Sequence, residues 1–308
     1  MKRPIGISTW VWDSPLTDAN LGGHLARIAA LGFDAVELPL ENDGDFTASV
    51  VREALESTGL TPFLVGAMAP GRDLVSTAPA SVEATQAYLL ACVAMAAGIG
   101  SPTVCGPFYA RTGRTWRMSA EQRREAYAEL RRSLEPVADR ALEAGVVLGI
   151  EPLNRYETSL INTVEQALEA LGPLLGNGVG IALDSYHLHI EERSLAAAVR
   201  AAGEHVVHVQ VCGNDRGAPG DDQTDWDGFL QALDEVGYTG PLNIESFTAD
   251  NAAIAVAASI WRPLAPSQDE LAARGLAYLR RAWGSYDGGM GPGSLPTPPR
   301  SSTLTRLR

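Results

Sequence analysis

Eight short apolar or β-branched segments alternate with longer segments rich in Ala, Leu, Glu and Arg along most of the chain. No hairpin signal joins neighbouring apolar segments, and this alternation is typical of βα units that share a parallel sheet. Eight such units in about 280 residues predict a single-domain α/β fold, a closed (β/α)8 barrel over residues 1–284. The expected strands are 4–8, 34–38, 61–65, 102–105, 146–151, 179–184, 205–211 and 241–246.

An open, doubly wound sheet is the main alternative, and it usually has a Gly-rich phosphate-binding turn after its first strand. Here the first predicted strand continues into Ser-Thr-Trp-Val-Trp, and neither GxGxxG nor GxxxxGK[ST] follows any predicted strand. Residues 285–308 are rich in Gly, Pro, Ser and Thr without apolar periodicity, so we expect a flexible tail outside the barrel. The clearest helices are predicted at 81–97, 119–144, 163–171, 227–236 and 269–283.

The charge balance excludes several kinds of partner. Lys and Arg total 24 against 37 Asp and Glu, a formal charge of −13, which repels nucleic acid and anionic lipid. There is no uninterrupted run of about 18 apolar residues, so we expect no membrane partner. The three cysteines are far apart without a CxxC pair, and the N-terminus lacks the pattern of a signal peptide. These features predict a cytoplasmic protein.

Polar side chains end four neighbouring predicted strands, at the barrel mouth where such folds place their chemistry. They are Glu151, Asp184, Gln210 and Glu245. Three carboxylates at one partly dehydrated mouth repel one another unless protonation or a cation relieves them. A divalent ion held by these oxygens, with Gln210 as the fourth ligand, is the simplest explanation. Mn²⁺, Mg²⁺ or Co²⁺ suits this set better than Zn²⁺, since thiolates are absent from it.

Each candidate residue, taken singly, also has a structural interpretation. One buried carboxylate is often paired with a Lys or Arg, and a lone histidine such as His187 is more often a cap than a catalyst. Arg216 could be a solvated loop charge, and Trp10 and Trp12 could be core aromatics. The clustering of acidic residues at neighbouring strand ends favours the metal site.

Five motifs carry or flank these residues: EPLNRYET (151–158), DSYHLHIEE (184–192), NDRGAPG (214–220), IESF (244–247) and IWRPL (260–264). They resemble the sugar isomerase/epimerase family with a xylose isomerase-like TIM barrel. The similarity is strongest to the ketose 3-epimerases that act on D-tagatose and D-psicose, and it covers most of residues 4–284.

The resemblance implies a divalent metal, Mn²⁺ first, bound by Glu151, Asp184, the position of Gln210, and Glu245. It implies that Glu151 and Glu245 also act as the acid/base pair on opposite faces of a sugar. The candidate substrate-binding residues are Trp12, Glu157, His187, His208 and Arg216.

Two positions depart from the family pattern. Gln210 stands where the family has a metal-binding histidine, and Gly213 where it has a glutamate. An amide oxygen is a weaker donor than imidazole, so metal affinity and preference should change. Loss of the glutamate should alter which hydroxyl groups are recognised.

The expected reaction is proton abstraction next to a carbonyl through a cis-enediolate, which gives a ketose 3-epimerase or an isomerase. The alternative is an eliminase on 3-oxo-glycosides, similar to the catalytic subunit of C-glycoside deglycosidases, which works with a smaller partner chain. The resemblance otherwise implies a homo-oligomer. An endonuclease of this barrel type would need a His-rich zinc site and a basic surface, whereas the chain has five His. The presence of Glu151 and Glu245 disfavours a non-catalytic sugar-binding barrel. Apart from Arg216, the strand-end loops contain no cluster of Lys or Arg, and this favours an unphosphorylated sugar.

Overall fold

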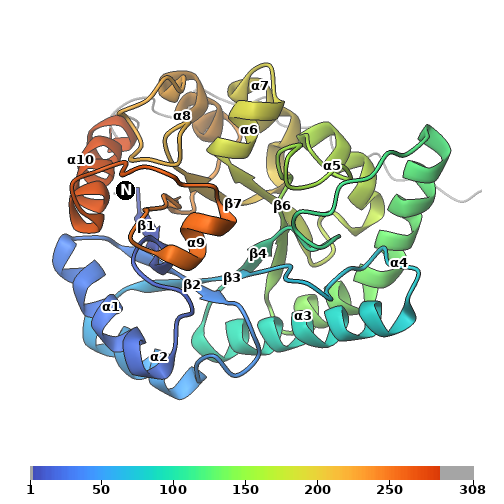
Figure 1. Cartoon of the computed structure of the whole chain (residues 1–308), viewed down its shortest axis with the longest axis horizontal. Helices are drawn as coiled ribbons and strands as arrows, with labels where there is room; N and C mark the ends of the chain where they lie inside the picture. The colour runs from blue at the N-terminus through green and yellow to red at the C-terminus, as the bar shows by residue number, and fades with distance from the viewer. Residues whose placement is uncertain (1–2, 285–308) are drawn as a thin grey trace, which may run out of the picture.

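The computed structural model describes residues 3–284, which form a closed barrel of eight parallel strands in consecutive order (Figure 1). The prediction of a single-domain (β/α)8 barrel is confirmed. Every predicted strand is present, with bounds at most two residues from those expected. The strands are Ile5–Ser8 (β1), Ala35–Leu40 (β2), Thr61–Gly66 (β3), Thr103–Gly106 (β4), Val147–Ile150 (β5), Val179–Asp184 (β6), Val206–Val211 (β7) and Leu242–Ile244 (β8).

Helices surround the barrel, and the five predicted ones also lie within two residues of their expected bounds. The tail predicted at 285–308 lies outside the described residues. The helices are Asp18–Leu31 (α1), Ala48–Thr58 (α2), Pro79–Ile99 (α3), Ala120–Glu143 (α4), Val164–Leu171 (α5), Ser185–Glu191 (α6), Leu195–Ala202 (α7), Trp226–Glu235 (α8), Ala252–Ala257 (α9) and Gln268–Gly284 (α10), with short 3₁₀ helices at Thr9–Val11 (η1), Gly172–Leu174 (η2) and Gly203–His205 (η3).

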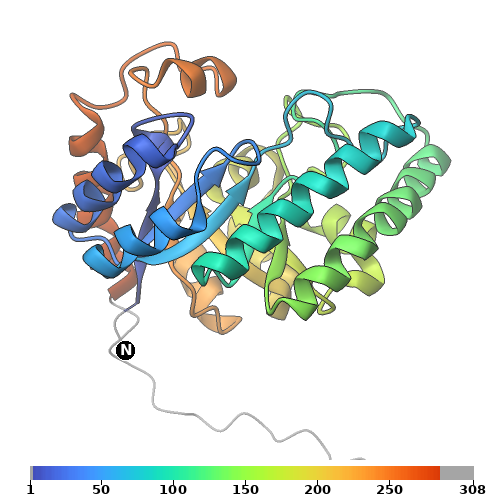
Figure 2. The same cartoon turned by 90° about the horizontal axis from the view of Figure 1, so that it is seen from below.

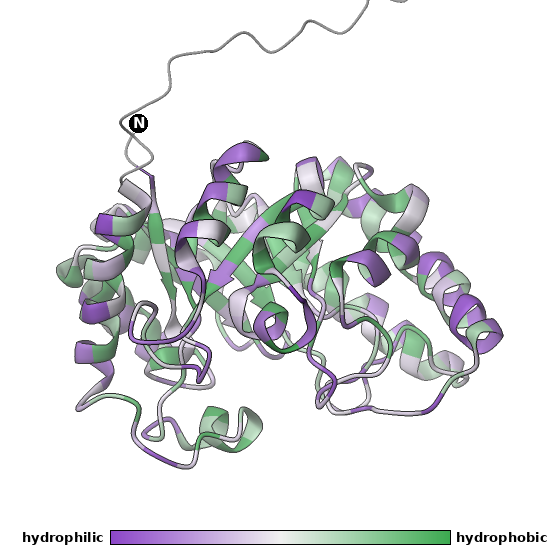
Figure 3. Ribbon diagram, turned by 90° about the horizontal axis from the view of Figure 1, so that it is seen from above, coloured by the Kyte–Doolittle hydropathy of each residue, from purple (hydrophilic) through white to green (hydrophobic). Residues whose placement is uncertain are grey.

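Local sequence explains where the helices begin and which face they bury. The hydroxyl of Ser119 accepts from the N–H of Gln122, and the Gln122 side chain accepts from the N–H of Ser119, which is a capping box at the start of α4. Figure 3 shows the strands largely green and much of the surrounding helical surface purple, the pattern expected of helices that pack one apolar face on a barrel.

α3 is long and apolar enough to cross a membrane by length and composition alone, within the part of the chain searched. It packs on β3, β4, α2 and α4 as one of the outer helices of the barrel. A core helix of a soluble protein passes the same test, so this helix is weak evidence for a membrane span.

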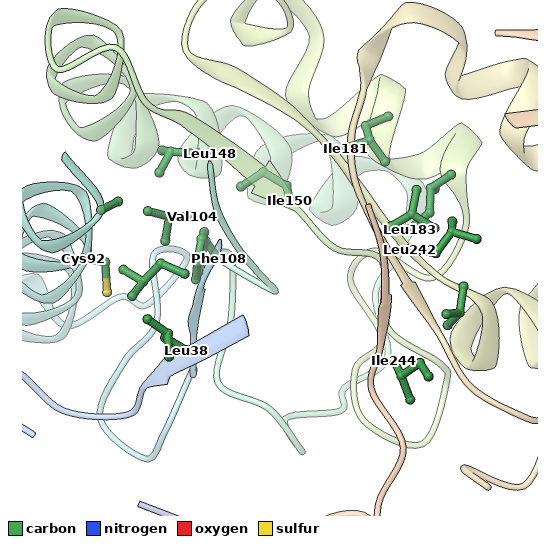
Figure 4. Packing of buried hydrophobic residues seen from close by; sticks show 14 of the residues in the cluster. Leu38, Cys92, Val104, Phe108, Leu148, Ile150, Ile181, Leu183, Leu242 and Ile244 are labelled. Carbon is green, nitrogen blue, oxygen red and sulfur yellow. The ribbon is translucent and has the colours of Figure 1, made fainter. Parts of the chain in front are cut away.

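Alternation along the strands separates the apolar packing layer from the barrel interior. Figure 4 shows Leu148 and Ile150 of β5 and Leu242 and Ile244 of β8 in the apolar layer of the barrel wall. The residues between and after them point to the opposite face. At Gly149 an added Cβ would lie 3.2 Å from the Cβ of Cys105 and 3.3 Å from that of Ala182, so these alternate positions meet inside the barrel.

The barrel has two unequal ends. Figure 2 shows the connection that carries α9 above one end, opposite the end at which the chain enters β1. Parallel strands all end on the same side, so the carboxyl ends of β5 to β8 lie together at the end with the α9 connection.

Candidate active site

The structure brings the predicted strand-end residues to one mouth. Glu151 follows β5, Asp184 ends β6, Gln210 lies in β7 and Glu245 follows β8. Gln210 is in register with both Asp184 and Asn243, so these strand ends lie level with one another. All four predicted side chains are buried.

Arg216 is the cation at the centre of this group. Its Nη1 lies 2.5 Å from Oδ2 of Asp184 and 3.1 Å from Oε2 of Glu245. The guanidinium lies between two aromatic rings, with its Cζ 4.1 Å from the ring centroid of Tyr186 and 4.7 Å from that of Phe247. The backbone of Arg216 has a φ of 69°, a conformation that non-glycine residues seldom adopt. The loop therefore carries local strain at the residue that reaches the carboxylates.

Asn154, which the sequence reasoning did not single out, organises the β5–β6 side of the mouth. Its backbone N–H donates to Nδ1 of His187 over 3.0 Å, and its side-chain amide donates to the same nitrogen over 2.9 Å and to Oε1 of Glu157 over 2.8 Å. The other ring nitrogen, Nε2, lies 3.0 Å from Nη2 of Arg216, so donors approach both ring nitrogens. That Nε2 also lies 3.5 Å from Oε1 of Glu151 and 3.5 Å from Oδ2 of Asp184.

Burial dominates the protonation of this site. It raises the pKa of Glu151 and of Glu245 well above the ordinary glutamate value, and the nearby carboxylate of Asp184 raises both further while Arg216 opposes the shift. Burial and Arg216 lower the pKa of His187 well below its usual value, which favours the neutral ring. Burial also raises the pKa of Glu157.

The donor set fits a divalent ion. Glu151, Asp184 and His187 offer ligand atoms that all lie within 4.8 Å of one another. Oε1 of Gln210 is buried without a hydrogen-bond partner, which leaves an oxygen donor unused. Within residues 3–284, Arg216 is the one Lys or Arg whose ion pairs reach Asp184 and Glu245. When ionised, the carboxylates outnumber the single guanidinium, and a divalent cation relieves the excess negative charge.

This compact set of carboxylate and imidazole ligand atoms differs from the predicted one. It contains His187, which was expected to bind substrate, and does not contain Glu245, which was a predicted ligand. Glu245 reaches Asp184 through the shared Nη1 of Arg216. The ligand roles of Gln210 and Glu245 stay predictions.

Glu37, another residue that the sequence reasoning missed, lies inside the barrel on β2 with no exposed surface. Its Oε1 lies 2.5 Å from Nε2 of His208, and its Oε2 accepts from Nε2 of Gln210 over 3.3 Å. The same Gln210 nitrogen donates to Oε1 of Glu245 over 2.8 Å. A glutamate within the apolar strand sequence AVELPL was the signal that could have found it, because buried charges need a partner.

Two predicted substrate-binding residues lie elsewhere than expected. Trp12 is buried in the core, and its indole N–H donates to Oδ1 of Asp269 in α10 over 2.7 Å. His208 has no exposed surface, because it lies two residues before Gln210 on β7 and so deeper in the barrel. Its ring contacts Glu37 and lies 5.5 Å from the ring of Phe63. These placements favour structural roles for both residues.

Trp10, a possible core aromatic in the sequence, packs against the interior of the barrel. It is partly buried against the interior residues Val65, Cys105 and Ala182 and lies 6.5 Å from the ring of Phe247. These contacts make an apolar wall at the mouth.

The loop around Gly213 leaves little room for a side chain. A Cβ at this position would lie 3.2 Å from the carbonyl oxygen of Ala218 and 3.3 Å from Oδ1 of Asp215. A glutamate here, as in the family pattern, would therefore require this loop to shift.

Comparison with known proteins identifies relatives of this chain in sequence and in fold. The family model described as xylose isomerase-like TIM barrel matches residues 25–282. A ketose 3-epimerase from Arthrobacter globiformis is 31% identical over 278 residues, which is 90% of this chain and 95% of the relative. The 3-dehydro-D-guloside 4-epimerase of Escherichia coli (strain K12) is 33% identical over 144 residues, 46% of this chain and 54% of that enzyme.

Solved structures show the same similarity. The D-allulose 3-epimerase from Methylomonas sp. superimposes with a TM-score of 0.84 at 28% identity, covering 92% of this chain and 99% of the solved chain. The same enzyme in complex with D-allulose also gives a TM-score of 0.84.

The resemblance inferred from the strand-end motifs is thus confirmed, as is the prediction of an enzyme of the isomerase/epimerase class. Because the family model spans most of the described barrel and a relative of 31% identity aligns along nine-tenths of the chain, the protein belongs to the xylose isomerase-like TIM barrel family.

Proposed function

We propose that the chain is a divalent-metal-dependent 3-epimerase of a small, unphosphorylated ketose. The observation that carries the proposal is the meeting of Glu151 and Glu245 at one mouth, from strands β5 and β8, with Asp184 and Arg216 between them. The full-length similarity to proteins named ketose 3-epimerases supports it.

Glu151 and Glu245 are proposed as the acid/base pair. One carboxylate removes the proton from C3 and the other, as its acid form, returns a proton from the opposite face, which inverts that carbon. Burial raises the pKa of both groups, which brings the two protonation states closer in free energy at neutral pH. Positioned proton transfer of this kind contributes about 10² to 10⁴ in rate.

Glu151, Asp184, Gln210 and Glu245 would hold the metal, with Mn²⁺ expected ahead of Mg²⁺ or Co²⁺. A bound divalent ion stabilises the negative charge that develops on the sugar oxygens as C3 loses its proton. The side chains of the protein bind the sugar and transfer its protons.

Glu157, His187 and Arg216 are proposed to bind the carbonyl end of the sugar. Asn154 holds the ring of His187 through Nδ1, and Nε2 of that ring lies 3.0 Å from Nη2 of Arg216, so the two side chains form one binding surface. Arg216 supplies a donor, and Glu157, held by Asn154, accepts from a hydroxyl group. The apolar wall at Trp10 leaves the far end of the sugar with few polar contacts.

The remaining expectations are a cytoplasmic location and a homo-oligomer with a sugar as its small-molecule substrate. Both stay predictions, and size-exclusion chromatography with light scattering measures the oligomer.

The test incubates the Mn²⁺-loaded protein with D-tagatose, D-fructose and D-allulose in D₂O and follows the sugars by NMR. We expect deuterium at C3 together with the C3 epimer, and no turnover after exhaustive chelation. Deuterium at C1 or C2 with an aldose product would instead make the protein an isomerase. Turnover that survives complete metal removal contradicts the proposed metal dependence.

An enzyme acting on 3-oxo-glycosides is the second candidate. The partial similarity to a 3-dehydro-D-guloside 4-epimerase favours it, as does the Gly213 loop that departs from the ketose 3-epimerase pattern. Release of an aglycone from a 3-oxo-glycoside, with co-purification of a small subunit, would identify the eliminase.

A further inference from the structure

We propose that Glu37 is a positioning residue that locks the side-chain amide of Gln210, so that this amide presents its oxygen to the metal and its nitrogen to Glu245. The inference rests on the proposed function for the role of the oxygen. It concerns a buried carboxylate on β2 that the proposed reaction does not otherwise use.

Two carboxylates determine which way the amide faces. Nε2 of Gln210 donates to Oε1 of Glu245 over 2.8 Å and to Oε2 of Glu37 over 3.3 Å. In the opposite orientation the amide oxygen would face two carboxylate oxygens, with two hydrogen bonds lost and like charges opposed. Only the observed orientation satisfies both neighbours.

The locked orientation leaves Oε1 of Gln210 buried and without a partner. A buried polar atom without a hydrogen bond costs free energy, and a bound ion is one way in which folded proteins satisfy such an atom. A carbonyl-type oxygen beside Asp184 in the strand register suits a hard divalent cation.

Glu37 is itself held in place. Its second oxygen, Oε1, lies 2.5 Å from Nε2 of His208, which fixes the carboxylate between two side chains of β7. Because β2 and β7 are not neighbours in the barrel, the contact crosses the interior. This explains why His208 is buried beneath Gln210 rather than exposed at the mouth.

Carboxylates that accept a hydrogen bond from a metal ligand commonly fix the orientation of that ligand. Groups that orient a metal ligand typically change metal affinity by about 10- to 100-fold when removed. Removal of the Glu37 carboxylate should therefore weaken metal binding by a similar factor, although Glu37 contacts neither the metal nor the sugar.

The first test measures Mn²⁺ binding by calorimetry in a double-mutant cycle of Glu37→Gln and Gln210→Leu. We expect Glu37→Gln to weaken Mn²⁺ binding about 10-fold in the wild-type background and by less than about twofold in Gln210→Leu. Glu41→Gln is the matched control: this glutamate directly follows β2 and accepts from Trp10 and Ser14 rather than from Gln210. It should leave the affinity unchanged. Equal losses from Glu37→Gln in both backgrounds would overturn the inference.

The second test observes the amide directly in metal-free protein. The side-chain NH₂ signal of Gln210 should be protected from solvent exchange, and Glu37→Gln should reduce that protection by at least about tenfold. An unchanged NH₂ signal overturns the inference whatever the metal result. If the wild-type protein binds no Mn²⁺, the proposed function fails in its metal dependence, while this NMR measurement still decides the orienting role of Glu37.

Steady-state kinetics separate positioning from a structural role. Glu37→Gln should lower kcat for the ketose about tenfold and change KM by less than about threefold, since Glu37 contacts no substrate group. Should Glu37→Gln fail to fold, Glu37→Asp replaces it in both tests, because it keeps the charge but withdraws the oxygens from Gln210. Full protection of the Gln210 amide in a folded Glu37→Asp protein would count against the inference.

Discussion

The two sides of the barrel mouth are built in different ways. On the β5–β6 side, Asn154 joins Glu157, in the loop after β5, to His187, in α6 after β6, and these contacts span at most 33 residues of sequence. On the β7–β8 side, Glu37 reaches Gln210 and His208 across 173 and 171 residues of sequence. One side is a local arrangement, and the other exists only once the barrel closes.

The two sides also differ in how completely their polar atoms are paired. The β7–β8 side contains unpartnered buried atoms on His208, Gln210, Arg216 and Asn243. No fully buried side-chain nitrogen or oxygen of Glu151, Asn154, Glu157 or His187 lacks a partner within residues 3–284. The β7–β8 side is therefore the one with unused hydrogen-bonding capacity among its buried atoms.

The largest expected effect tests whether both sides take part in the chemistry. Glu151→Gln and Glu245→Gln should each lower kcat about 10² to 10⁴-fold, because the amide keeps the shape of the side chain and cannot exchange the proton. Circular dichroism should show an intact fold, and Glu53→Gln on the exposed part of α2 should leave kcat unchanged. Substantial turnover in either site variant would remove that residue from the acid/base pair.

Removing the local organiser should give the next largest effect. Asn154→Ala deletes three side-chain hydrogen bonds, two donated to His187 and Glu157 and one accepted from the N–H of Tyr156, and leaves buried groups unpaired. That costs about 1–3 kcal/mol, which corresponds to a loss of roughly 5- to 160-fold in kcat/KM. Asn177→Ala, an exposed asparagine before β6, serves as the control. Unchanged kcat/KM in Asn154→Ala would show that His187 and Glu157 do not need this support.

The stability of the metal-free protein should fall with rising pH, because each side of the mouth has one buried glutamate with a raised pKa, Glu151 and Glu245. Burial raises the pKa of Glu151 and Glu245, so the folded state keeps protons that the unfolded state has already released. Stability should therefore fall as pH rises from the ordinary glutamate pKa of about 4.3 towards the raised folded values. Differential scanning calorimetry with chelator checks this. A melting temperature that rises over the same interval would contradict the assigned shifts, and Mn²⁺ should reduce the dependence.

The smallest expected effect tests whether the hydrogen-bond network of Asn154 extends to the start of α5. The hydroxyl of Thr163 caps α5 by accepting from the N–H of Gln166, outside the Asn154 network. Thr163→Ala should lower the free energy of unfolding by about 1 kcal/mol and leave kcat/KM unchanged. Urea denaturation and steady-state kinetics measure the two quantities. A parallel loss of activity would show that the start of α5 also positions Glu157.

Much of this molecule follows from short-range patterns in its sequence. The alternation of apolar strands and amphipathic helices determined a closed (β/α)8 barrel, since each strand must bury one face on helices and the other inside. The same alternation determined that Glu151, Asp184, Gln210 and Glu245 meet at one mouth, because parallel strands end on the same side. The different surroundings of Trp10, in η1, and Trp12, directly after η1, were beyond such patterns, because nearby tryptophans differ only in the partners that tertiary structure supplies.

Tertiary structure alone decided which polar groups pair inside the barrel. Glu37 reads as a single charge in an apolar strand, and its partners lie on a strand across the interior. Arg216 reads as a loop charge, and only the closed mouth places it between Asp184 and Glu245. Hydrogen bonds act over about 3 Å and depend on direction, so they are determined by the distance between strands in space, which periodicity along the chain does not encode.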